Sequence, residues 1–314
     1  MFKVFIDGKE GTTGLRIYER FLNREDIEIL TIPDELRKDP VEKAKIINQS
    51  DITFLCLPDA AAIESVSLVT NPNTRIIDAS TAHRTNADWA YGFPELDNNF
   101  HEKIKNAKKV AVPGCYATGF TSIVYPLIKM DIITKDFPII VNAISGYSGA
   151  GKKAIALYED KMRKKELDAP RLYSMAQAHK HLKEMKYISN LDKNPIFNPY
   201  ICDFYSGMLV TISLDVSILK TKITPKKLQN VLKNYYKEND FIRVQKFLEN
   251  GTETGFLPAN HLSGKDYLEI YVTGNEERIN IIACLDNLGK GASGAAIECM
   301  NIMLGLDAKT GLEM

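Results

Sequence analysis

The first third of the chain alternates between short apolar runs and longer stretches whose apolar residues recur at helical spacing. The stretches predict helices at 15–22, 40–49 and 60–69, and the apolar runs predict strands at 2–6, 27–32, 52–57, 75–78 and 109–112. Strands that alternate with helices at this spacing indicate a parallel sheet covered on both faces. The pattern therefore predicts a doubly wound α/β domain.

A glycine-rich turn separates the first predicted strand from the first predicted helix. Gly8, Gly11 and Gly14 have the spacing G-x-x-G-x-x-G, with Thr12 and Thr13 between them. Such glycines let the backbone approach a pyrophosphate, which the N–H groups of the following helix face. We therefore predict a Rossmann dinucleotide-binding domain over residues 1–114. A purely structural glycine turn is the alternative.

The stretch after the second strand bears on the cofactor's 2′ position. It reads Pro33-Asp-Glu-Leu-Arg-Lys38. Its acids favour a ribose hydroxyl, as in NAD, whereas Arg37 and Lys38 favour a 2′-phosphate, as in NADP. The residues by themselves leave both cofactors open.

The pattern changes after the helix predicted at 117–129. A strand is predicted at 139–144, and residues 210–214, 268–272 and 279–285 alternate between apolar and polar. Period-two alternation indicates a mainly antiparallel sheet with one covered face. A helix is predicted at 224–236, with Thr224 as its N-cap. Residues 115–289 are thus expected to form an α+β domain, and a last helix within 290–314 to complete the first domain.

Composition narrows the function classes. The 314 residues carry no formal net charge, and five cysteines are scattered without a CxxC pair. Zero charge provides no basic field for nucleic acid or an anionic membrane. No apolar segment has the length of a signal peptide core or a membrane span. Scattered thiols suit a reducing cytoplasm and argue against a structural metal site. We expect a cytoplasmic protein without a bound metal.

Cys115 is the candidate nucleophile. It follows Pro113 and Gly114, which end the last predicted strand of the first domain, and it precedes the helix that we predict from Ala117. Unpaired N–H groups and the dipole at a helix N-terminus favour the thiolate. A small buried cysteine is the alternative interpretation.

His179 and His181 are the candidate proton carriers, because a thiolate nucleophile needs one nearby. Metal binding is the rival use, but no acidic or cysteine cluster accompanies them. We favour His181 as the acid/base, because Leu182-Lys-Glu184 resumes an apolar-polar pattern and places His181 at the start of a segment.

Three other stretches suit small ligands. Ser80 and Arg84 lie beyond the carboxyl end of the fourth strand, where open α/β sheets bind ligands. The turn 145–152 precedes a helix and predicts a second anion site. The glycine-rich stretch 285–297 permits close approach to another backbone or to a cofactor.

The motifs together resemble the N-acetyl-gamma-glutamyl-phosphate reductase family, in its shorter second type. The similarity covers nearly the whole chain. It rests on the Gly8–Gly14 turn, Pro113-Gly-Cys-Tyr-Ala-Thr118, Ser145-Gly-Tyr-Ser-Gly-Ala-Gly151, His179-Lys-His181 and Asp286-Asn-Leu-Gly-Lys-Gly-Ala-Ser-Gly294. Where the longer type has Arg-Gly, this chain has Ser206-Gly207, so no role is carried over from that arginine.

The resemblance implies an oxidoreductase of arginine biosynthesis that uses NADPH, in which Cys115 forms a thioester with an acyl phosphate. It implies a homodimer or homotetramer formed through the sheet of the α+β domain. From their positions in the chain, we expect the cofactor to be bound by Gly8, Gly11, Thr12, Thr13, Gly14, Ser80, Asn287 and Gly291, and the substrate by Arg84, Ser145, Ser148 and Gly149.

Three other functions remain to be weighed. An aspartate-type semialdehyde dehydrogenase would use the same chemistry, but we expect Asn-Cys there, and this chain has Gly114-Cys115. A cysteine hydrolase would not need the N-terminal nucleotide turn. A non-catalytic dinucleotide-binding protein would not need Cys115 and His181.

Overall fold

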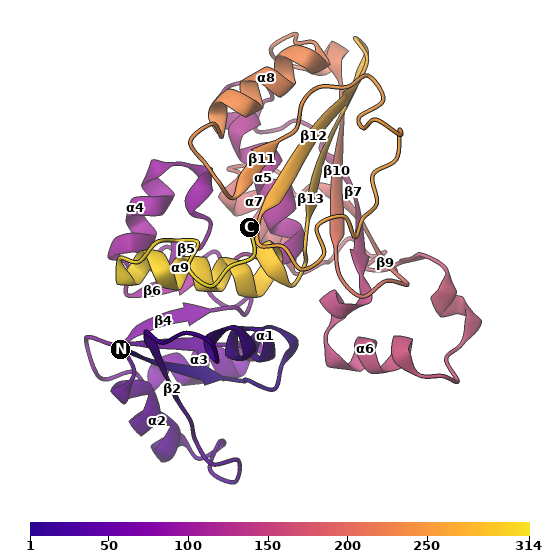
Figure 1. Cartoon of the computed structure of the whole chain (residues 1–314). Coiled ribbons are helices and arrows are strands. Elements are labelled where there is room, and N and C mark those ends of the chain that lie inside the picture. The colour runs from indigo at the N-terminus through magenta and orange to yellow at the C-terminus, as the bar shows by residue number, and fades with distance from the viewer. The chain divides into compact units, whose positions relative to one another are not determined.

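The computed structural model describes residues 1–314, and the chain divides into two compact units. The first unit comprises Met1–Gly114 and Ala292–Leu312, and the second comprises Cys115–Gly291 and Glu313–Met314. Each unit has a sheet of its own (Figure 1). None of the helices combines the length and the apolar character that crossing a bilayer requires.

The first unit contains a six-stranded sheet in the order β2-β1-β3-β4-β6-β5. All neighbouring strands are parallel. The strands are β1 (Phe2–Asp7), β2 (Ile27–Leu30), β3 (Ile52–Leu55), β4 (Arg75–Asp78), β5 (Ala90–Tyr91) and β6 (Lys109–Ala111). This confirms the α/β prediction, whereas the sequence pattern did not reveal the two-residue strand β5.

Five helices belong to the first unit: α1 (Thr12–Phe21), α2 (Pro40–Gln49), α3 (Asp59–Ser67), α4 (Asn98–Asn106) and α9 (Gly294–Leu304). The C-terminal helix α9 lies beside α4 (Figure 1). Its residues Ala296, Ile297 and Met300 are fully buried with Val4 and Ile52 of the sheet, since small and apolar residues nearly surround this helix. A buried Arg24 donates to Asn301 Oδ1 at 2.9 Å and anchors the same helix.

The second unit contains a seven-stranded mixed sheet in the order β11-β12-β13-β10-β7-β9-β8. The pairs β7–β9 and β11–β12 are parallel, and the other neighbours are antiparallel. The strands are β7 (Ile140–Gly146), β8 (Arg171–Leu172), β9 (Ile196–Cys202), β10 (Met208–Asp215), β11 (Ile242–Val244), β12 (Leu268–Gly274) and β13 (Arg278–Leu285).

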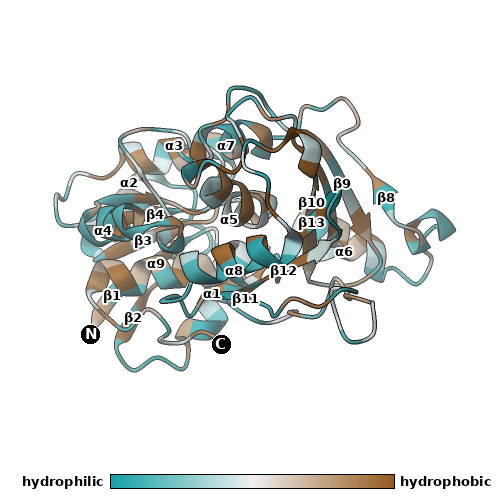
Figure 2. Ribbon diagram, turned by 90° about the horizontal axis from the view of Figure 1, so that it is seen from above, coloured by the Kyte–Doolittle hydropathy of each residue, from teal (hydrophilic) through white to brown (hydrophobic).

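Helices α5 (Cys115–Lys129), α6 (Lys152–Glu159), α7 (His181–Ile188) and α8 (Pro225–Tyr235) complete the second unit. Helices α5 and α8 contact the sheet, on which the alternating Val210, Ile212 and Leu214 are buried as predicted. In Figure 2, α5 is mostly hydrophobic, whereas α8 has both hydrophilic and hydrophobic residues. Thr224 caps α8 through a hydrogen bond from Lys227 N.

The expectation of one covered face is wrong for β12. Glu269 and Tyr271, which alternate with its apolar residues, are also buried. The reason is that Leu262 and Leu257 of the preceding loop pack with Tyr271 over the second face. Polar residues within a strand therefore did not mark a solvent face here.

Candidate functional site

Cys115 is the first residue of α5, two positions before the predicted start of this helix. Its side chain is partly exposed. The N–H groups of the first helical turn lack intrahelical acceptors, and the dipole of this 15-residue helix favours an anion at its N-terminus. The position suits a thiolate nucleophile.

The other four thiols occupy environments that disfavour a thiolate or access to it. Burial and the carboxylates of Asp78 and Asp7 raise the pKa of Cys56 to about 12. Burial and Glu269 raise the pKa of Cys284 to about 12. Cys202 and Cys299 are buried. Cys115 is thus the cysteine best placed to react.

His179 and His181 lie together at the start of α7. The backbone N–H of His181, the first residue of the helix, donates to His179 Nδ1 at 3.1 Å. The two rings meet edge to face, with centroids 4.7 Å apart. His181 is buried, whereas His179 is partly exposed. Burial lowers the pKa of His179 to about 4, with a smaller contribution from Lys180, so its ring is neutral at pH 7.

Tyr116 joins the nucleophile's helix to both histidines. It follows Cys115, and its ring centroid lies 5.7 Å from that of His179 and 6.0 Å from that of His181. Its hydroxyl accepts a hydrogen bond from Tyr173 at 3.1 Å. Burial raises the pKa of Tyr116 well above its usual range, so this phenol stays neutral. The histidine pair is therefore packed against the first turn of α5.

The predicted anion turn is fastened to a neighbouring loop. Tyr147 N and Ser148 N donate to the carbonyls of Phe204 and Tyr205, at 2.9 and 3.0 Å. Asn287 accepts from Gly207 N at 2.8 Å and donates to Ser148 Oγ at 3.0 Å. Asn287 thus uses both ends of its amide inside the second unit, where it joins three loops.

Two of the ligand-binding candidates are crowded glycines. A Cβ on Gly149 would lie 3.0 Å from Ser145 Oγ and 3.3 Å from the Asn287 amide nitrogen. A Cβ on Gly291 would lie 2.9 Å from Cys115 Cβ. Gly291 therefore packs directly against the nucleophile, which explains why a side chain is absent there.

In the first unit, the glycine turn leads from β1 into α1 as predicted, and α1 begins at Thr12 rather than at Leu15. Gly8 has a positive φ of 88°, and a Cβ on Gly14 would lie 2.5 Å from Gly8 O. By contrast, a Cβ on Gly11 would lie 3.4 Å from the same oxygen. Gly8 and Gly14 thus shape the turn itself, whereas Gly11 leaves an open approach to its backbone.

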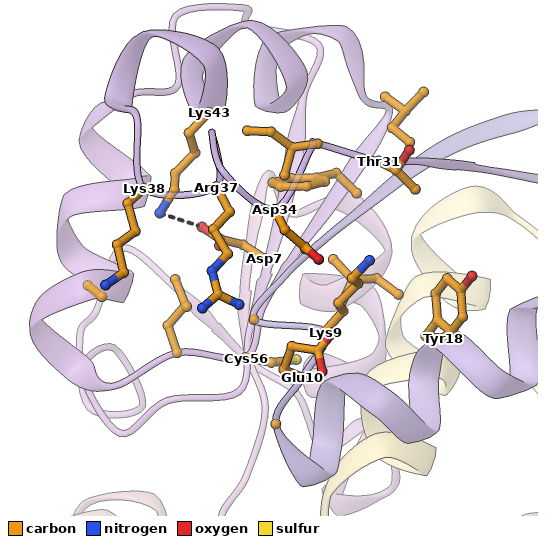
Figure 3. A pocket seen from close by; sticks show the side chains of 18 of the residues that line it. Asp7, Lys9, Glu10, Tyr18, Thr31, Asp34, Arg37, Lys38, Lys43 and Cys56 are labelled. Carbon is orange, nitrogen blue, oxygen red and sulfur yellow. Dashed lines mark ion pairs between the residues drawn. The ribbon is translucent and has the colours of Figure 1, made fainter.

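A pocket of about 560 Å³ opens beside this turn and is lined by residues of β1, β2 and the segments that follow them. Figure 3 shows Arg37 and Asp34 extending toward the turn, with Lys38 further out. Lys43 pairs with Asp7 at 3.1 Å, and Ser65 donates to the same carboxylate at 2.9 Å. The pocket offers a concave, partly basic site next to close-approach glycines, as a dinucleotide requires.

Ser80 and Arg84 bracket a buried network at the end of β4. Ser80 N and Oγ each donate to the Asp78 carboxylate at 2.8 Å, and His83 Nδ1 lies 2.6 Å from it. Arg84 is buried and donates to the carbonyls of Val112 and Ala79, at 2.8 and 3.0 Å. These contacts tie the loop to the strand that leads to Cys115. A substrate role for Arg84 stays a prediction.

No group of three or more His, Cys, Asp or Glu side chains is arranged to hold a metal ion. The rings of His179 and His181 contact the Tyr116 ring and each other.

Comparison with known proteins assigns both units. The semialdehyde dehydrogenase NAD binding domain matches residues 18–107, and the semialdehyde dehydrogenase dimerisation domain matches residues 115–287. N-acetyl-gamma-glutamyl-phosphate reductase 2 of Nostoc is 44% identical over 99% of both chains. N-acetyl-gamma-glutamyl-phosphate reductase of Brucella ovis is 44% identical over 96% of this chain and 99% of its own.

The chain belongs to the N-acetyl-gamma-glutamyl-phosphate reductase family of semialdehyde dehydrogenases. It is therefore an oxidoreductase whose first unit binds a nicotinamide dinucleotide.

Solved structures of other semialdehyde dehydrogenases share the fold of this reductase family member. Aspartate semialdehyde dehydrogenase II of Vibrio cholerae has a TM-score of 0.72 at 15% identity, over 97% of this chain and 99% of that one. The Francisella tularensis aspartate semialdehyde dehydrogenase has a TM-score of 0.71 at 16% identity, over 97% and 100% of the two chains. At such identity the likeness shows the fold alone.

Several residues of this reductase site were not predicted from the sequence. Tyr116 stands inside the Gly-Cys-Tyr motif, so its place beside the nucleophile was a usable signal. Tyr173 gave none, because only the fold brings it to Tyr116, 57 residues away in the sequence.

Proposed function

We propose that this protein reduces N-acetyl-gamma-glutamyl phosphate to N-acetylglutamate 5-semialdehyde and phosphate, with NADPH as reductant, in arginine biosynthesis. The observation that carries the proposal is the partly exposed Cys115 at the start of α5, with the His179–His181 pair packed against the next residue. It occurs in a chain 44% identical to reductases of this name over nearly the whole length. The aspartate-type alternative rests on neighbours at 12–16% identity, which share the fold only.

The chain's own residues account for the acyl transfer. The Cys115 thiolate attacks the carbonyl carbon of the acyl phosphate, a C–S bond forms, the C–O bond to phosphate breaks, and phosphate leaves. N–H groups of the first turn of α5 are oriented to stabilise the oxyanion that develops. When bound, the dinucleotide supplies the hydride that reduces the thioester, and collapse of the thiohemiacetal releases the aldehyde and restores the thiolate.

His181 is the proton carrier in this scheme. His179 has its Nδ1 occupied by the His181 N–H and its Nε2 3.4 Å from the Tyr173 hydroxyl, and its ring is neutral at pH 7. His179 therefore positions, while His181 exchanges the proton that the oxyanion takes up. Ser145, Ser148 and Gly149 remain our candidates for holding the substrate.

The assay that tests the activity runs in the oxidative direction. We expect NADP⁺ reduction with N-acetylglutamate semialdehyde and phosphate, and little or none with aspartate semialdehyde and phosphate. Preferential turnover of the aspartate compound would replace the proposed substrate. Turnover of a thioester or ester without any dinucleotide would instead favour a cysteine hydrolase.

Gly11 and Gly14 should respond differently to an added side chain. Gly11→Ala should fold normally, because its Cβ meets nothing closer than 3.4 Å, but should raise the Kd for NADPH about 10-fold by blocking the pyrophosphate. Gly14→Val should lose both binding and thermal stability, since its Cβ would lie 2.5 Å from Gly8 O. Titration by NADPH fluorescence and a melting curve measure the two effects. Normal NADPH binding by both variants would move the phosphate site elsewhere.

NADP rather than NAD is proposed from the pocket's charges. Arg37 lines it and points toward the turn (Figure 3), where a guanidinium suits a 2′-phosphate. Arg37→Ala with Lys38→Ala should raise the Kd for NADPH about 10- to 100-fold and leave NADH binding within about 2-fold. Asp34→Ala is the matched control, and it should not weaken NADPH binding. Selective loss of NADH binding in the double variant would assign NAD instead.

We propose that the exposed part of the second unit's sheet, over β7 and β9, forms a homodimer. Ile140, Ile144 and Ile196 are between 37% and 51% exposed on it, next to the Asn198–Asn142 and Ser213–Asn280 hydrogen bonds. Exposed isoleucines on a sheet face need a partner surface, and the family assigns dimerisation to this part of the chain.

A charged side chain introduced on the proposed interface tests whether this face forms the dimer. Ile144→Lys should shift the sedimenting species to the monomer, because two lysines would approach each other in a desolvated interface. Ile63→Lys on α3, where the native side chain is 55% exposed, is the matched control and should leave the mass unchanged. An Ile144→Lys protein that remains dimeric would exclude this face.

We also propose a cytoplasmic location. All five cysteines are free in the structure, as a reducing compartment would keep them.

A further inference from the structure

Three hydroxyls connect His179 to the predicted anion turn. The Tyr173 hydroxyl lies 3.4 Å from His179 Nε2 and donates to the Tyr116 hydroxyl at 3.1 Å. Tyr116 in turn hydrogen-bonds the side chain of Ser145, whose Oγ donates to Gly146 O at 3.0 Å. We call these four side chains, His179, Tyr173, Tyr116 and Ser145, the row. The row links residues that lie far apart in the sequence, and it includes Tyr116, the residue next to Cys115.

The direction of the two hydrogen bonds between His179 and Tyr116 follows from the tautomer of His179. A backbone amide can only donate, so the His181 N–H makes Nδ1 of His179 an acceptor, and the proton of the neutral ring must be on Nε2. Nε2–H then donates to Tyr173, and Tyr173 donates to Tyr116, whose hydroxyl also bonds the side chain of Ser145. The Tyr173 hydroxyl accepts from one neighbour and donates to the other, so the two hydrogen bonds strengthen each other.

The far end of the row holds the start of α7. The N–H of its first residue, His181, is one of the helix donors that lack an intrahelical acceptor, and the His179 ring satisfies it. Holding the His179 ring therefore also fixes the backbone from which His181 projects. The ring is further enclosed by Tyr116 and Phe197, with centroid distances of 5.7 and 5.1 Å.

We propose that Tyr173 and Tyr116 are positioning residues of the reductase, whose hydroxyls orient His179 and through it His181. The proposal rests on the proposed function for the role of His181. Ring packing alone would not need the hydroxyls, since phenylalanine would fill the same space. Tyr116 is buried and Tyr173 is partly buried, and a phenol removed from water without a hydrogen-bond partner costs free energy, so the hydrogen bonds of both tyrosines stabilise the arrangement.

Phenylalanine variants test the hydroxyls while keeping the rings. Tyr173→Phe and Tyr116→Phe should each lower kcat about 10-fold, because small displacements of an acid/base group are costly, and leave the KM for NADPH unchanged. Since either change breaks the same row, the double variant should be no slower than the slower single variant. Tyr236→Phe is the matched control. It removes a buried hydroxyl that donates to Ser122 O of the same helix α5 at 2.7 Å, and it should leave kcat unchanged.

A readout without substrate separates this proposal from the proposed function. In ¹⁵N-histidine-labelled protein, His179 should give a single Nε2–H tautomer with a slowly exchanging proton, and Tyr173→Phe should abolish that slow exchange. Carbamidomethylation of Cys115 should also slow in both tyrosine variants. If wild-type protein fails the reductase assay but these signals behave as stated, the function is wrong and the row stands.

Three results would overturn the row: an Nδ1–H tautomer for His179, multiplicative losses in the double variant, or an equal kcat loss in Tyr236→Phe. Should Tyr173→Phe fail to fold, the slow exchange in Tyr116→Phe decides the matter by the same criterion.

Discussion

Cys115→Ser should abolish the reductase reaction, with kcat reduced by at least about 10⁴-fold. A serine hydroxyl in the first turn of α5 stays protonated at neutral pH, whereas a thiol there is converted to a nucleophile by the helix N-terminus. The other cysteines are poorly placed to replace it, because burial raises the pKa of Cys56 and of Cys284, and Cys202 and Cys299 are buried. Steady-state NADPH oxidation with the acyl phosphate measures the loss.

Two controls show whether the loss of activity in Cys115→Ser reflects the loss of the nucleophile. NADPH titration should show an unchanged Kd, because the dinucleotide pocket belongs to the first unit. Wild-type protein mixed with acyl phosphate should release phosphate in a burst and gain the mass of the acyl group on Cys115, and the serine variant should show neither. A serine variant that retains more than about 1% of the activity would rule out the thioester route.

The sequence patterns predicted those parts of the fold that depend on local order. Apolar runs marked β1, β3 and β4, since parallel strands buried on both faces need no alternation. Pro113-Gly114 correctly placed Cys115 at the junction of a strand and a helix. The alternation from Val210 to Leu214 marked β10, whose buried face packs against helices.

Local sequence patterns did not predict those elements and contacts whose partners lie far away in the sequence. Pro199 within β9 made that strand unrecognisable, because a proline normally excludes a paired strand, yet it stands opposite Ala143 of β7. No local pattern indicates that the Asn287 amide joins Gly207 to Ser148, which lie 80 and 139 residues away in the sequence. Such pairs follow from sheet topology and not from spacing. A cofactor contact of Asn287 stays a prediction.

His181→Asn should lower kcat by about 10²- to 10⁴-fold and flatten the neutral-pH limb of the rate profile, because it removes the proton carrier. His179→Asn should lower kcat less and leave that limb in place. The pKa of His179 is near 4, so its protonation cannot produce a limb near neutral pH. Profiles of kcat between pH 5 and 9, recorded for both variants, measure the difference.

The pH dependence of the free energy of unfolding tests the lowered pKa of His179 independently of enzyme activity. Because its pKa falls from the usual 6.5 to about 4 on folding, the unfolded chain binds a proton in this interval that the folded chain does not. The wild type should therefore lose stability as pH falls from 6.5 to 4, and this part of the loss should vanish in His179→Asn. Loss of the neutral limb in His179→Asn, with the limb kept in His181→Asn, would reverse the two roles. A limb kept in both variants would show that neither histidine carries the proton.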